Sequence, residues 1–136
     1  MITIYKSTDA GLITLTEPTE GCWINVIDPT PDEFAHLEKL GIPRDYLSYP
    51  LDVDERPRVE RENGELLIVL RVPLFNGKTA DIQYSTIPLG IILTGQYLLT
   101  VCKQDNSILQ DMVCGRARGL STPKRYRFIL RLLLMT

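Results

Sequence analysis

The sequence predicts an α/β fold, in which strands and helices are combined in one domain. Three observations lead to this prediction: several short runs with strand-like patterning, segments with helix-capping residues, and the run Leu66–Leu70, which is apolar at every position. A chain of 136 residues matches one domain and buries roughly two thirds of the surface that its unfolded form exposes. A single hydrophobic core is therefore expected.

The first three strands are predicted near the N-terminus. Met1–Lys6 and Leu12–Glu17 alternate apolar and polar residues on either side of the turn Asp9-Ala10-Gly11. Cys22–Ile27 is a third strand, and it is expected to end at Asp28-Pro29. Proline lacks the backbone donor that a strand ladder needs, and it restricts the residue before it.

Two helices are predicted next. Thr30-Pro31-Asp32-Glu33 is typical of a helix start, with a hydroxyl cap, a proline in the first turn and a glutamate that completes a capping box. Gly41 provides the stop. A second, short helix is predicted over Arg44–Tyr49 and is expected to end at Pro50. The apolar face of the first helix consists of Phe34, Leu37 and Leu40.

The middle of the chain is predicted to form a β-hairpin. Asn63-Gly64 is a strong two-residue turn signal between Arg58–Glu62 and Glu65–Val72. Because Leu66–Leu70 is apolar throughout, it suits an interior strand covered on both faces better than an edge strand. Two further strands are predicted over Ile82–Leu93 and Tyr97–Val101. Pro88 indicates a bulge or an edge position in the first of them.

The C-terminal part is predicted to be helical. Asn106–Gly115 is a helix-like segment, and Ser121-Thr122-Pro123 has the pattern of a helix cap followed by proline. The helix that begins there has no stop signal before the last residue, so we expect the chain to be cut inside a longer helix. No stretch reaches the roughly 18 apolar residues of a membrane span. We divide the chain into residues 1–120 and 121–136.

Composition excludes several classes of function. One histidine and three widely spaced cysteines give little support to a zinc site or to a nucleophilic triad, and no phosphate-binding glycine loop occurs. We therefore predict that the chain is not an enzyme and has no organic cofactor. Lys124–Phe128 mixes basic and aromatic residues, but the acidic remainder of the chain would repel phosphates, so nucleic-acid binding is not expected.

The run Leu51–Glu60 interleaves charges of both signs and is the main candidate site. Asp52 and Asp54, with Glu55, could coordinate Mg²⁺, which favours a few carboxylates together with retained water. The alternative is a structural cluster of ion pairs that joins these acids to basic residues nearby, namely Arg56, Arg58 and Arg61.

Several segments together resemble the N-terminal cytoplasmic domain of CorA-like Mg²⁺/Co²⁺ transporters, in matching order and spacing. The likeness extends over nearly the whole chain, although the Gly-Met-Asn signature of the family lies outside it. The segments are Cys22–Val26, Pro29–Glu33, Leu40–Pro43, Leu51–Glu60, Leu66–Leu70, Ile91–Thr94, Leu98–Val101 and Arg127–Leu133.

The resemblance implies a mixed β-sheet packed between α-helices, followed by the start of a long stalk helix at residues 121–136. It also implies a homopentamer in the cell membrane, with this domain on the cytoplasmic side and Mg²⁺ between subunits as a regulatory ion. In relatives an acidic pair upstream of the Arg-Pro unit contributes to that cation site. The corresponding residues here are Ser48 and Tyr49, so Asp52 and Asp54 are the candidate metal ligands.

Two alternatives stay open at this stage. A relative specialised in zinc efflux would share the same fold as the Mg²⁺/Co²⁺ transporter. From a different class, the chain could be a stand-alone, non-enzymatic interaction module whose C-terminal helix docks on a partner.

Overall fold

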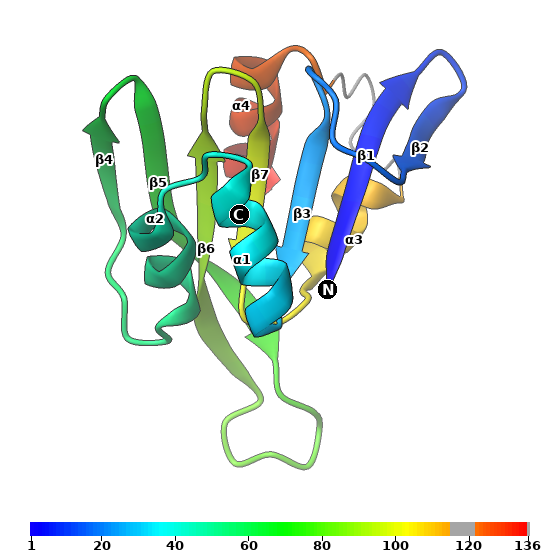
Figure 1. Cartoon of the computed structure of the whole chain (residues 1–136). Helices are drawn as coiled ribbons and strands as arrows, with labels where there is room; N and C mark the ends of the chain where they lie inside the picture. The colour runs from blue at the N-terminus through cyan, green and yellow to red at the C-terminus, as the bar shows by residue number, and fades with distance from the viewer. Residues whose placement is uncertain (115–121, 136) are drawn as a thin grey trace.

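The computed structural model describes residues 1–114 and 122–135, and over these residues it contains one seven-stranded sheet with helices on both faces (Figure 1). The helical elements are α1 (Pro31–Lys39), α2 (Arg44–Ser48), the short 3-10 helix η1 (Tyr49–Leu51), α3 (Ser107–Val113) and α4 (Arg125–Met135). The strands are β1 (Ile2–Thr8), β2 (Gly11–Leu15), β3 (Trp23–Ile27), β4 (Arg58–Glu62), β5 (Glu65–Phe75), β6 (Tyr84–Leu93) and β7 (Leu98–Cys102).

The sheet is mixed, as predicted. Its strand order is β2-β1-β3-β7-β6-β5-β4, and every neighbouring pair is antiparallel except β3 and β7, which run parallel. The parallel pair lies at the centre, where Asn25 is opposite Thr100. The connection between these two strands passes through α1, α2 and the other half of the sheet. The β5–β6 hairpin extends beyond the other strands (Figure 1).

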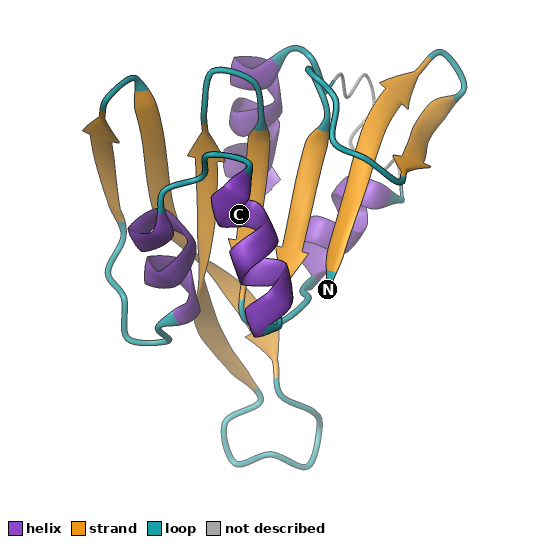
Figure 2. Ribbon diagram, in the orientation of Figure 1, coloured by secondary structure: helices purple, strands orange, loops and turns teal. Residues whose placement is uncertain are grey.

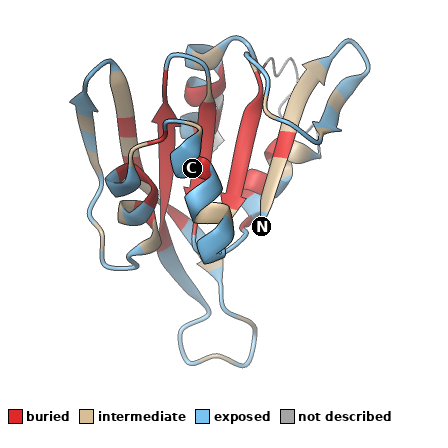
Figure 3. Cartoon of the chain, in the orientation of Figure 1, coloured by how far each residue is buried: buried red, intermediate tan, exposed pale blue. Residues whose placement is uncertain are grey.

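Helices cover both faces of the sheet and create two apolar layers (Figure 2). Alternate residues of each strand point to opposite faces, so Trp23 packs with α3 and α4 while its neighbour Ile24 packs with α1 and α2. The buried residues concentrate in the central strands β3, β7 and β6 (Figure 3). This α/β/α sandwich confirms the predicted fold class.

The helix-capping prediction is confirmed in detail. The Thr30 hydroxyl accepts a hydrogen bond from the Glu33 backbone N–H, and the Glu33 carboxylate accepts one from the Thr30 backbone N–H. Gly41 follows the helix end with φ of 90°, a conformation that glycine adopts at little cost. Asn63 and Gly64 both have positive φ, as the predicted two-residue hairpin turn requires.

Two local predictions around prolines need correction. Pro50 does not end the second helix, because α2 stops at Ser48 and Pro50 lies inside η1. Thr122 does not cap α4, which begins only at Arg125. Its hydroxyl instead accepts a hydrogen bond from the backbone N–H of Ser7 at 3.1 Å, a contact between segments 115 residues apart.

Pro88 lies in the interior strand β6, in the part of that strand that pairs with β5 alone. β6 pairs with β5 along its whole length, whereas its pairing with β7 spans only Leu89–Leu93. Pro88 therefore lies one residue beyond the reach of β7, where its missing N–H removes no bond to that strand. The expectation of an edge position is met locally.

The C-terminal helix packs on one of the two apolar layers. Phe128, Ile129 and Leu132 of α4 join the apolar layer that contains Trp23. The division proposed at residue 120 and the predicted helix positions Gly115 and Ser121 lie outside the described residues. Within the described part, no helix is long and apolar enough to cross a bilayer.

Candidate cation site

The candidate site is a short charged loop that links η1 to β4. The loop folds back on itself through two backbone hydrogen bonds, from Asp52 N to Tyr49 O at 3.1 Å and from Glu55 N to Asp52 O at 3.0 Å. The Asp52 carboxylate accepts a third bond from the Asp54 backbone N–H at 3.0 Å. This local turn places both aspartates on one exposed loop.

Arg71 of β5 fixes the loop to the sheet. Its guanidinium donates to the backbone oxygens of Val53 at 3.1 Å and Glu55 at 3.0 Å. It also donates to the hydroxyl and the backbone oxygen of Thr86 on β6, both at 2.8 Å. Five donors in a rigid fork allow one arginine to hold two segments at once. Arg71 therefore positions the loop that carries Asp52 and Asp54.

Sequence reasoning did not single out Arg71. The signal that could have found it is a lone basic residue among the apolar positions of a strand, because a charge placed there needs partners. Its partners Val53 and Glu55 precede it by 18 and 16 residues and contribute only backbone oxygens, which no side-chain pattern reveals.

Arg58 organises the second half of the charged run. It forms ion pairs with Glu55 and with Glu60, and its guanidinium carbon lies 4.6 Å from the centre of the Tyr49 ring. Burial opposes the charged guanidinium, but the hydrogen bonds to both glutamates outweigh it and raise the pKa of Arg58. This part of the run is a structural ion-pair cluster, which agrees with the alternative interpretation for Glu55 and Arg58.

Asp52 and Asp54 are not part of that cluster. In the described part of the chain the ion pairs of the run join Arg58 to Glu55 and Glu60, and neither aspartate takes part. Both aspartates are exposed. Across the described ranges, no group of three or more histidine, cysteine, aspartate or glutamate side chains is arranged to hold a metal. The described residues therefore show two exposed aspartates on one loop and no assembled metal site.

Ser48 and Tyr49 lie where the resemblance implies an acidic pair, and both have other contacts in this structure. The Ser48 hydroxyl donates to the backbone oxygen of Asp45 at 3.2 Å, and Tyr49 lies beneath Arg58. Neither side chain provides a carboxylate.

The Trp-Ile-Asn sequence of β3 has a structural explanation. The Trp23 indole N–H donates to the Thr100 hydroxyl at 2.8 Å, and that hydroxyl donates to the Asn25 side-chain oxygen, also at 2.8 Å. Trp23 and Thr100 are fully buried, so the chain of bonds satisfies polar atoms inside the core. Thr100 lies on β7, the parallel partner of β3, so these hydrogen bonds link the two strands.

Comparisons with known proteins agree with this fold. Residues 19–133 match the model of the CorA-like Mg²⁺ transporter protein family. The cobalt/magnesium transport protein CorA of Methanocaldococcus jannaschii is 39% identical over 108 residues, which are 79% of this chain and 31% of that protein. The chain thus spans about a third of the length of this relative.

Solved structures show the same arrangement. The soluble domain of CorA from Methanocaldococcus jannaschii superposes with a TM-score of 0.79 at 25% identity, covering 99% of this chain and 55% of that one. The ZntB cytoplasmic domain from Vibrio parahaemolyticus RIMD 2210633 superposes with a TM-score of 0.70 at 15% identity, covering 98% of this chain and 56% of that one. The second likeness concerns the fold alone.

The sheet order and the two helical layers define an α/β/α domain of the kind found in these proteins. The family model covers most of the sequence. The chain belongs to the CorA-like Mg²⁺ transporter family.

Proposed function

We propose that this chain is the cytoplasmic regulatory domain of a divalent-cation transporter that carries Mg²⁺ or Co²⁺, and that it senses intracellular cation to gate the pore. Family membership carries the proposal, since the curated relative is a cobalt/magnesium transport protein at 39% identity. The 15% identity to the ZntB domain gives no comparable support for zinc efflux. In this role the chain acts without catalysis, and the full-length protein is a membrane homopentamer.

The anchored loop provides the sensing element in this proposal. Arg71 holds the backbone of the loop, so Asp52 and Asp54 are presented from a fixed position toward solvent. Two unit charges about 4 Å apart interact by about 1 kcal/mol in water and about 4 kcal/mol near a protein surface. When two acidic surfaces of neighbouring subunits approach, they repel until a cation lies between them, so Mg²⁺ favours the closed arrangement.

The proposal is tested by thermal unfolding of this chain with millimolar MgCl₂, against NaCl of equal ionic strength, which removes general screening. A complete site at 100 times Kd would add about 2.7 kcal/mol, and two carboxylates from one chain should add far less, so we expect a small upward shift in Tm. The shift should disappear in the double variant Asp52→Asn/Asp54→Asn. Asparagine keeps an oxygen that can accept the Asp54 backbone bond.

The matched control is Asp9→Asn/Asp81→Asn, which removes the same charge from two exposed positions in other turns. The control should respond to Mg²⁺ as the parent does. If the Asp52/Asp54 variant also responds as the parent does, these residues are not ligands and the sensing role of the loop is wrong.

A further inference from the structure

Tyr46 of α2 has a buried hydroxyl without a hydrogen-bond partner. The residue is only 3% exposed, and among the described residues its hydroxyl is the buried side-chain polar atom that lacks a partner. Buried polar groups are nearly always hydrogen-bonded, so an exception calls for an explanation, such as a ligand that completes the bond. The surroundings of this hydroxyl therefore indicate what the ligand is.

The end of the β4–β5 hairpin carries three glutamates on the same face of the sheet as Tyr46. Glu62 and Glu65 are directly opposite each other in the strand register, and Glu60 is opposite Leu67. Leu67 packs in the same apolar layer as Tyr46. Residues that are opposite each other, or two apart along a strand, share a face of the sheet. We call Glu60, Glu62 and Glu65 the glutamate row.

The glutamate row carries more negative charge than its neighbours neutralise. Arg58 forms an ion pair with Glu60, but Glu55 shares the same arginine. The ion pairs of the described residues include neither Glu62 nor Glu65. Like charges directly opposite each other on two strands destabilise the pair. A cation bound at the row would remove this repulsion.

The Tyr46 hydroxyl and the glutamate row call for the same kind of ligand. Burial is the main cause that raises the pKa of Tyr46, and the negative charges of the three glutamates raise it further. A neutral phenol accepts a hydrogen bond from a cation while it donates one to a carboxylate. The ligand is therefore positively charged and donates hydrogen bonds.

The shape of the row favours a ligand with two cationic ends. Glu60 and Glu62 are two residues apart on β4, which is about 7 Å along the strand. An ammonium group has three donors and no acceptor, so it suits a site made of carboxylates and a phenol oxygen. A metal ion needs its ligands around one point, and no three acidic, histidine or cysteine side chains in the described ranges are so arranged.

We infer that the glutamate row and Tyr46 bind a short aliphatic diamine. One ammonium group lies between Glu62 and Glu65 at the Tyr46 hydroxyl, and the other lies near Glu60. The hydroxyl is covered in this structure, so neighbouring side chains turn aside before it meets the ligand. The inference goes beyond the proposed function and does not rest on it, because it involves neither the loop of Asp52 nor a transported ion.

Isothermal titration calorimetry with putrescine, a four-carbon diamine, at low ionic strength tests the inference. The parent should bind one molecule per chain. Glu62→Gln/Glu65→Gln should weaken binding by about tenfold or more, since it removes both charges that contact one ammonium group. Tyr46→Phe should weaken binding by roughly two- to tenfold, as expected for the loss of one hydrogen bond.

The stability of Tyr46→Phe separates a ligand role from a structural one. Without diamine this variant loses no hydrogen bond, so its Tm should equal or exceed that of the parent. With putrescine the parent should gain more in Tm than the variant does. A variant that is less stable than the parent but binds putrescine equally well would show that the hydroxyl is structural, which contradicts the inference.

Two matched controls separate a specific site from a general effect of charge. Glu20→Gln/Glu38→Gln removes the same charge from two exposed glutamates outside the hairpin and should bind putrescine as the parent does. Fully N-methylated putrescine carries the same charge without N–H donors, so the parent should bind it several-fold more weakly.

Four further results overturn the inference. No binding to the parent excludes the site, and equal binding to Glu62→Gln/Glu65→Gln places the diamine elsewhere. Equal binding of the methylated diamine means that charge alone is responsible. Finally, the titration is repeated on the full-length protein. If that protein does not bind putrescine while this chain does, the remainder of the polypeptide occupies the row.

Discussion

Gly90 of β6 lies directly beneath Pro50 of η1, and an alanine there is predicted to destabilise the chain. A Cβ added at Gly90 would lie 2.2 Å from Pro50 Cγ and 2.9 Å from Pro50 Cβ. The proline ring is buried and cannot rotate away, so η1 would have to move off the sheet. Because η1 leads into the loop of Asp52, the same movement would displace the candidate cation site.

The size of the effect follows from two opposing contributions. Forcing an extra carbon into a packed core typically costs about 1–3 kcal/mol. Alanine also lowers the conformational entropy of the unfolded chain, which stabilises the folded state by about 0.4–1 kcal/mol. Subtracting the two ranges gives a net loss of about 0–2.6 kcal/mol in the free energy of unfolding. Because the added Cβ would overlap two atoms of the Pro50 ring, we expect the upper part of this range, about 1–2.6 kcal/mol, or roughly 3–13 °C in Tm for a domain of this size.

Urea unfolding followed by tryptophan fluorescence measures this loss, since the chain has one tryptophan in its core. Gly95→Ala is the matched control, because a Cβ there meets no atom within 4 Å. The control should unfold within about 0.5 kcal/mol of the parent. If Gly90→Ala is as stable as Gly95→Ala, the close packing of η1 on β6 is wrong.

Three further predictions concern polar contacts. Thr100→Val leaves the buried Trp23 indole N–H without an acceptor and should cost about 1–3 kcal/mol in urea unfolding, whereas Thr100→Ser should cost less. Hydrogen bonding from the Thr30 backbone lowers the pKa of Glu33 below its usual 4.5, so the stability advantage of the parent over Glu33→Gln should be fully present above that value. This advantage should disappear as the pH falls through the lowered pKa, which urea titrations at several pH values will measure. Arg71→Met releases the backbone of the loop and should speed amide hydrogen exchange around Asp54 more than in the distant α1.

Each of these predictions has a clear contrary result. If Thr100→Val and Thr100→Ser lose the same free energy of unfolding, the hydroxyl at this position does not stabilise the fold. A difference between parent and Glu33→Gln that persists unchanged at low pH would contradict the lowered pKa. Unchanged exchange in Arg71→Met would show that the loop is held by its own hydrogen bonds.

Local patterns in the sequence predicted those features that depend on local physics. The capping box at Thr30 and the turn at Asn63 were predictable because their hydrogen bonds and backbone angles involve residues close in sequence. The cap expected at Thr122 was wrong because its hydroxyl bonds to Ser7, a residue that becomes its neighbour only in the folded chain.

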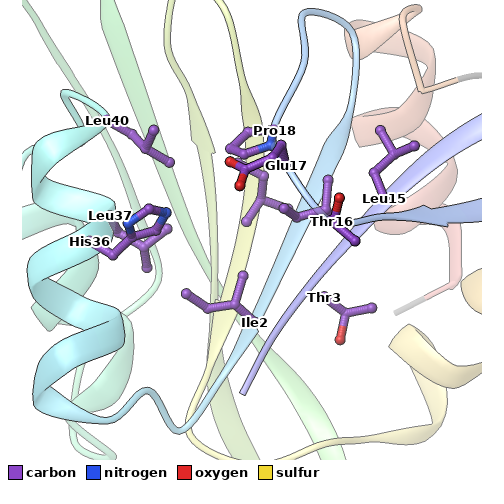
Figure 4. Close-up of a pocket in the computed structure, with 11 residues that line it drawn as sticks. Ile2, Thr3, Leu15, Thr16, Glu17, Pro18, His36, Leu37 and Leu40 are labelled. Carbon is purple, nitrogen blue, oxygen red and sulfur yellow. The ribbon is translucent and has the colours of Figure 1, made fainter.

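In the candidate site, too, the local features were predictable and the contacts between distant residues were not. The charged run was recognisable from its residue types, and the ion pairs of Arg58 lie within it. Its anchoring by Arg71 was not predictable, because the acceptors are backbone oxygens brought close by the sheet. The pocket between α1 and the strands β1 and β2 (Figure 4) likewise depends on tertiary packing, since its lining residues come from four separate stretches of the chain.

The central claim is that this domain lets intracellular cation regulate a transporter. The most direct measurement is Mg²⁺ and Co²⁺ influx through the full-length protein in liposomes loaded with low or millimolar internal Mg²⁺. Influx is expected to fall at high internal Mg²⁺ in the parent and to fall less in Asp52→Asn/Asp54→Asn. Zn²⁺ export in place of Mg²⁺ influx would contradict the proposed function. Parent influx that is the same at low and at millimolar internal Mg²⁺ would contradict the proposed regulation.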